Sequence, residues 1–100
     1  MEDYVARHGY GLLAALINAM VQAIGYVPMP THQANAFAYE VHNSQVMMAM
    51  YRLQHGSSYK GTIYTHAEAF TIWRMSQTLC KIVKLLPTEE AIQFSKEILA

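Results

Sequence analysis

The stretch 65–86, THAEAFTIWRMSQTLCKIVKLL, carries the clearest structural pattern in this 100-residue chain. It opens with a Thr-x-x-Glu capping box, in which the side chains of Thr65 and Glu68 can satisfy free backbone N–H groups at a helix start. Apolar residues then recur at helical spacing and form a predicted buried stripe: Ala69, Ile72, Met75, Leu79, Ile82 and Leu86. This pattern predicts a helix over residues 66–86.

Three further segments have helical patterns, separated by Pro28-Met29-Pro30, by the turn-rich stretch 56–65 and by Pro87. Gly25 can end the first helix, because glycine tolerates the positive φ of a helix C-terminus. Thr88 can start the last helix, with acidic residues in its first turn. We therefore predict an all-α fold of four helices at residues 3–25, 31–55, 66–86 and 88–99.

The first of these helices is expected to be the central element of a compact arrangement. Its apolar stripe is widened by Leu12 and Val21, so that little of its circumference is polar. A helix that is apolar nearly all round is usually buried. The chain has no repeat and no linker long enough to divide it, which predicts one helical domain over residues 1–100.

Composition excludes several classes of protein. Hydrophobic residues make up 53% of the chain and charged residues 14%, and the formal net charge is zero. A disordered chain needs low hydrophobicity and high net charge, and a globally basic nucleic-acid binder needs an excess of Lys and Arg. One cysteine cannot form an internal disulfide, which excludes a disulfide-stapled secreted scaffold.

A membrane span and a signal peptide are not expected. No charged residue occurs between Arg7 and Glu40, but the most apolar part, residues 12–27, is only 16 residues long and contains Asn18 and Gln22. A spanning helix needs about 20 predominantly apolar residues. The N-terminus is acidic where a secretory signal would be basic. We expect a cytoplasmic protein that does not contact membranes.

The apolar residues outnumber the sites that a small single-chain core provides, and few charges are available to cover them. This excess predicts that another chain covers part of the surface, with self-association as the favoured form. The second half of the second helix, VMMAMY, is apolar around its whole circumference. The predicted interface residues are Leu12, Val21, Met47, Met50 and Tyr51. The alternative is a monomer with a generous core and ordinary exposed apolar atoms.

Motifs for metal binding and catalysis are missing from the sequence. No two of the five histidines are three or four residues apart, and there is no second cysteine. Residues 56–62 superficially resemble a phosphate-binding loop, but no lysine follows Gly61 and no strand precedes it. We therefore expect no metal, no cofactor and no enzymatic activity. An enzyme or metal protein built from scattered histidines is a third alternative.

Basic residues gather in the middle of the chain. Arg74, Lys81 and Lys84 fall on the predicted polar face of the third helix, and Arg52 and Lys60 add to them. Residues 41–84 contain five basic residues and one acid, which gives a local charge of +4. Such a cluster can bind a phosphate backbone or a smaller anion.

Two ordinary explanations compete with that binding role: a solvated helix face, and pairing with the acids of the last helix, Glu89, Glu90 and Glu97. The sequence thus predicts a small non-enzymatic interaction or regulatory protein that forms a homo-oligomer or docks on a larger protein. The alternative is a binder of nucleic acid, a nucleotide or another small phosphorylated ligand.

Overall fold

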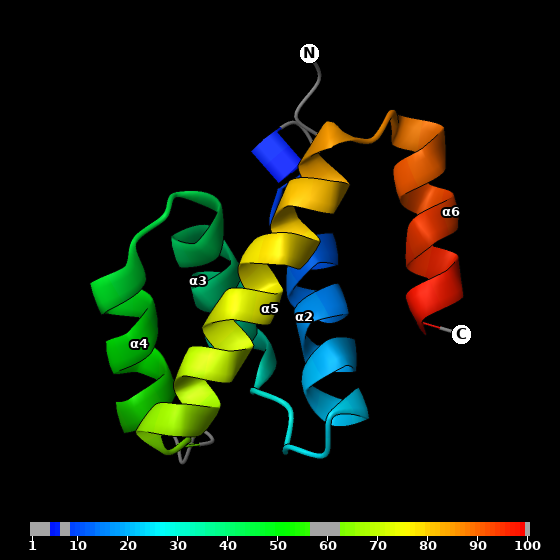
Figure 1. The fold of residues 1–100 in the computed structure, drawn as a ribbon. Helices are drawn as coiled ribbons and strands as arrows, with labels where there is room; N and C mark the ends of the chain where they lie inside the picture. Colours follow the sequence, from blue (N-terminus) through cyan, green and yellow to red (C-terminus); the bar gives the residue numbers. More distant parts are fainter. Residues whose placement is uncertain (1–4, 7–8, 57–62, 100) are drawn as a thin grey trace.

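Five α-helices make up the fold in the computed structural model, which describes residues 5–6, 9–56 and 63–99 (Figure 1). The helices are α2 (Gly11–Ala23), α3 (Thr31–His42), α4 (Val46–His55), α5 (His66–Leu85) and α6 (Thr88–Leu99). No strand occurs among the described residues. The all-α class is confirmed, with five helices where four were predicted.

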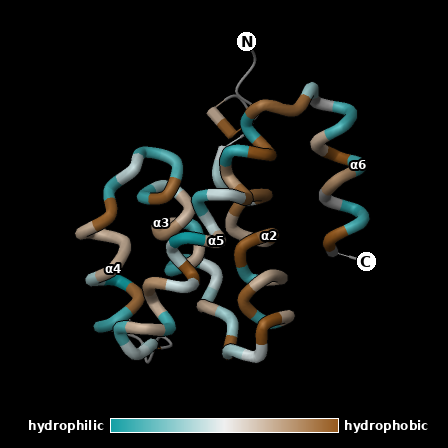
Figure 2. Tube along the Cα trace, viewed as in Figure 1, coloured by the Kyte–Doolittle hydropathy of each residue, from teal (hydrophilic) through white to brown (hydrophobic). Residues whose placement is uncertain are grey.

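The arrangement places α5 along α2, α3 and α4, whereas α6 contacts α2 at the opposite edge from α4 (Figure 1). The radius of gyration of 12.7 Å equals that expected for one compact domain of this length, about 13 Å. The core contains large side chains from four helices, among them Leu13, Ile17, Phe37, Leu53 and Ile72. Figure 2 shows the hydropathy along the chain, with apolar positions frequent along α2.

Side chains pin the connections onto this core. Asn18 of α2 and the backbone of Met29 exchange two hydrogen bonds of 2.8 Å, since the Asn18 amide donates to the Met29 carbonyl and accepts from the Met29 N–H. The Tyr64 hydroxyl donates to the carbonyl of Val27, and the Tyr64 N–H donates to the carbonyl of Leu53. The segments before α3 and before α5 are therefore held together.

The predicted helix over residues 31–55 is wrong as a single element, because it breaks after His42. Ser44 has φ +55°, in the left-handed region. The Ser44 N–H donates to the carbonyl of Val41, and the Gln45 N–H donates to that of Glu40. These two bonds form a Schellman motif, which ends α3 and turns the chain back as α4. Glycine usually occupies this position, so a serine there does not signal the end of a helix.

The predicted helix over residues 3–25 is also shorter than expected. Val5 and Ala6 are helical, but Gly9 has φ +85° and α2 begins only at Gly11. Its other end is confirmed. Gly25 has φ +95° and donates to the carbonyl of Gln22, while Tyr26 donates to that of Val21, in a second Schellman motif.

The start of α5 is confirmed, and its predicted buried stripe is confirmed in part, at Ala69, Ile72 and Leu79. Thr65 and Glu68 form both bonds of the capping box. Of the predicted stripe, however, Met75 and Ile82 are 36% and 42% exposed, whereas Ser76 and Val83 are fully buried. Because α5 contacts three helices, it buries a broad face that is rotated from the most apolar stripe.

No helix in the described part of the chain is long and apolar enough to cross a membrane.

The two Schellman motifs allow a matched stability test. Ser44→Gly should stabilise the fold by about 0.5–1 kcal/mol. The left-handed conformation costs a residue with a side chain about 1–2 kcal/mol, and glycine avoids this cost. The greater conformational entropy of glycine in the unfolded chain offsets part of the difference. Gly25→Ala should destabilise the fold by about 1 kcal/mol, because alanine is strained in the left-handed conformation. An added Cβ at this position meets no atom within 4 Å, so the backbone conformation is the only source of strain. Thermal unfolding should separate the two variants by several degrees. Equal midpoints would contradict the left-handed assignment at one of the two positions.

Candidate functional site

The outer face of α4 exposes several large apolar side chains on one short helix. Only Ala49 and Leu53 of this ten-residue helix are buried, because α3 and α5 cover one narrow side of it. The residues left outside include four of the six residues in the apolar run 46–51. Their exposed fractions are Val46 44%, Met47 83%, Met48 55% and Tyr51 63%. We call these four residues the α4 outer face.

An aromatic pair stiffens one end of this face. The rings of Tyr51 and His55 stack at a centroid distance of 4.2 Å and an interplanar angle of 27°. The two residues are four apart, so they are neighbours on the helix surface, and Met47 continues the same row. A tyrosine held by stacking loses less rotamer freedom on binding, and its hydroxyl supplies a polar contact beside apolar area.

The predicted interface residues have three different environments. Met47 and Tyr51 are exposed on the α4 outer face. Leu12 and Met50 are partly buried and pack against the core. Val21 is fully buried, so its assignment to an interface is wrong. It belongs to the hydrophobic core, on a helix that contacts α3, α5 and α6.

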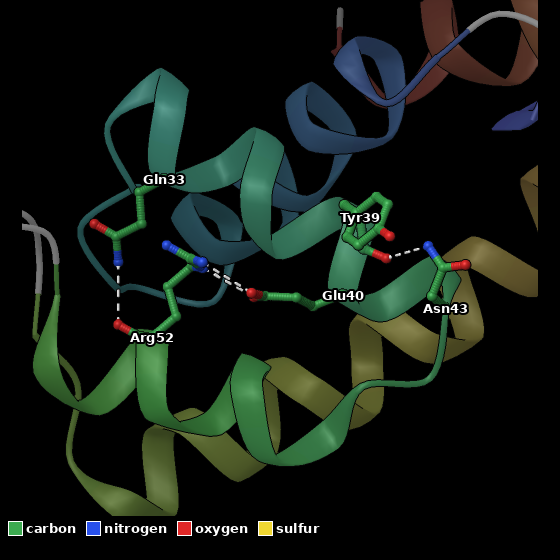
Figure 3. A network of polar contacts seen from close by, with 5 residues as sticks. All are labelled: Gln33, Tyr39, Glu40, Asn43 and Arg52. Carbon is green, nitrogen blue, oxygen red and sulfur yellow. Dashed lines mark hydrogen bonds and ion pairs between the residues drawn. The ribbon is translucent and has the colours of Figure 1, made fainter.

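The predicted cationic residues are also divided. Arg52 forms a bidentate ion pair with Glu40 across the α3–α4 turn (Figure 3). The Arg52 Nε donates to Glu40 Oε1 at 2.9 Å, and Nη2 donates to Oε2 at 2.8 Å. Glu40 is buried, and its hydrogen bonds raise the pKa of the Arg52 guanidinium above the ordinary value. The backbone carbonyl of Arg52 accepts from the Gln33 amide at 3.5 Å. Arg52 is therefore engaged in the fold, with no charge to spare for an external anion.

The remaining cations do not form one continuous stripe. Arg74 lies over the Phe70 ring, 5.7 Å from its centroid, beside an open hollow of about 340 Å³. Lys81 and Lys84 line a different, smaller hollow of about 90 Å³, which they share with residues at the end of α3. Lys60 lies outside the described residues. The structure thus brings together two of the five predicted residues.

Two groups of residues at these surfaces were not predicted from the sequence. Val46 and Met48 belong to the α4 outer face, and the all-round apolar run 46–51 was the signal for them. His42 and Ser44 line the hollow beside the lysines, and nothing in the sequence places them there. They reach it only because α3 ends at His42.

No three His, Cys, Asp or Glu side chains come close enough to hold a metal ion within residues 5–6, 9–56 and 63–99. Cys80 is buried and forms no disulfide. The expectation that the protein is not an enzyme stays a prediction.

Comparisons with protein-family models, with curated proteins and with solved structures found no match to this chain.

A double-mutant cycle tests the role given to Arg52. Arg52→Met should destabilise the fold by about 2–3 kcal/mol, because it leaves the buried Glu40 carboxylate without its partner. The double variant Arg52→Met/Glu40→Met should lose less than the sum of the two single variants, with a coupling of about 1–3 kcal/mol. Urea unfolding measures all four proteins. Strict additivity would show that the pair is not formed.

Proposed function

We propose that this protein is a small non-enzymatic helical interaction protein, and that it associates through the α4 outer face. The observation that carries the proposal is the exposure of Met47 and Tyr51 on a helix whose inner side buries only an alanine and a leucine. A contiguous exposed apolar patch is a frequent mark of a protein interaction site. Tyrosine and methionine are both enriched in interfaces.

The partner that we propose is a second copy of the same chain. The outer face carries no acidic residue, and its neighbour Arg52 is neutralised by Glu40. In a twofold dimer the same patch meets itself, so a charged patch would repel its copy and an uncharged patch does not. The zero formal net charge of the chain leaves no overall repulsion to oppose the encounter.

The energetics favour such a contact. Side chains that stay exposed in the folded chain contribute nothing to its hydrophobic stabilisation, and each buried apolar side chain of this size contributes about 1.5–3 kcal/mol when it leaves water. The stacked Tyr51 ring is already ordered, which lowers the entropic cost of association. Met47 and Met48 have flexible side chains that can adapt to a facing surface.

Sedimentation velocity over a range of micromolar concentrations should show a monomer–dimer equilibrium for the native chain. Met47→Lys and Tyr51→Lys should each weaken the dimer more than about tenfold, since each buries a charge at the centre of the contact. Ile92→Lys is the matched control, because it also places a lysine at a half-exposed apolar site, on α6. It should leave the equilibrium unchanged.

Thermal unfolding should show that Met47→Lys folds normally, because surface substitutions usually change stability by less than about 0.5 kcal/mol. A native chain that stays monomeric at the highest soluble concentration would exclude the second copy. The docking role would then require a larger protein as partner, with crosslinks from position 51 that Met47→Lys removes.

The alternative from the sequence, binding of an anion by the basic residues, stays a prediction. Fewer basic residues lie together than the sequence suggested, because Arg52 is paired with Glu40 and Arg74 lies beside a separate hollow.

A further inference from the structure

The smaller hollow lies where the end of α3 meets the C-terminal third of α5. Its polar lining comes from two segments that are about 35 residues apart in the chain, with His42 and Ser44 at the end of α3 and in the turn after it, and Gln77, Lys81 and Lys84 on α5. No acidic residue lines it. Its volume of about 90 Å³ has room for about three water molecules at ~30 Å³ each, so it suits one small polar group.

The two lysines have no internal partner in the part of the chain that the structure describes. Neither Lys81 nor Lys84 forms an ion pair or hydrogen bond there, and the acids of α6 that could have neutralised them do not do so. Their positive charges are therefore available to a group that enters the hollow.

The adjacent end of α3 does not use these lysines as caps either. Free carbonyls at a helix C-terminus often attract lysine side chains. Here the carbonyls of Tyr39, Glu40 and Val41 already accept backbone N–H groups of residues 43–45. The Tyr39 carbonyl also accepts the Asn43 side-chain amide at 2.9 Å (Figure 3). Capping of α3 thus gives no account of two lysines at this place.

We propose that this hollow binds a single phosphoryl group of the monoester type. Two ammonium groups match the charge of about −1.5 to −2 that a phosphate monoester carries near pH 7. Ser44 and Gln77 also line the hollow, and both residue types have side-chain donors for phosphate oxygens. The site requires no second chain, so it stands independently of association through α4.

A nucleic-acid backbone fits this surface less well. A phosphodiester strand carries one charge per phosphate and needs a row of cations along its path. Arg74 lies beside a different hollow, on Phe70, and Arg52 is bound to Glu40. The described cations therefore offer one anchoring point rather than a track.

Isothermal titration of the native chain with inorganic phosphate and with glycerol phosphate tests the site. We expect saturable binding of one equivalent that weakens as salt is added. Lys81→Met and Lys84→Met keep the apolar stems and should each weaken binding about tenfold or more, because charge-assisted hydrogen bonds are lost. Lys96→Met removes the same charge from α6 and should leave binding unchanged.

Three results would overturn the proposal. The first is no saturable binding of either probe up to about 10 mM, a limit that corresponds to about −2.7 kcal/mol. The second is equal weakening by Lys96→Met and Lys84→Met, which would indicate general charge attraction. The third is tighter binding of a single-stranded oligonucleotide without terminal phosphate, which would assign the surface to nucleic acid.

Circular dichroism of each variant confirms that the helices remain. Ser44→Ala keeps both lysines and should weaken binding less than either lysine change.

Discussion

The ion pair between Glu40 and Arg52 is the interaction on which the rest of this surface depends (Figure 3). It joins the end of α3 to the second turn of α4, and its two hydrogen bonds fix the distance and the rotation between the helices. With Arg52 turned toward α3, Ala49 and Leu53 face the core and Met47 and Tyr51 face solvent. A different rotation of α4 would bury the apolar row and expose the small inner residues.

The same turn determines where the charges of the molecule remain available. The Schellman motif at residues 43–45 satisfies the last carbonyls of α3 from the backbone, and Asn43 adds a side-chain bond. Neither the carboxylate of Glu40 nor these carbonyls then need Lys81 or Lys84. The polar groups of the α3–α4 connection thus form their hydrogen bonds with one another. As a consequence, the α4 outer face stays uncharged and the two lysines stay unneutralised.

Local signals predicted the parts of the fold that local chemistry determines. The capping box at Thr65 and the glycine at position 25 both have the predicted geometry, since each depends on residues within one turn. The break after His42 was missed because a serine occupies the left-handed position that glycine usually takes. The buried face of α5 was predicted in part: Ala69, Ile72 and Leu79 are buried, whereas Met75 and Ile82 are exposed, because three neighbouring helices also determine which residues are covered.

The candidate site was only partly predictable for the same reason. On one continuous helix, residues 40 and 52 would be about 18 Å apart at 1.5 Å per residue, so the sequence pattern gave no reason to pair them. Once the chain turns back at Ser44, the two residues become neighbours, and a cation predicted for ligand binding becomes a structural one. Within the apolar run 46–51, Met47 and Tyr51 are exposed, because a ten-residue helix packed between two neighbours cannot bury residues on every side. Their role in an interface stays a prediction. An excess of apolar residues therefore predicts exposed apolar positions where the excess is concentrated on one short helix. It does not predict exposure for a residue such as Val21, which lies on a helix that contacts three others.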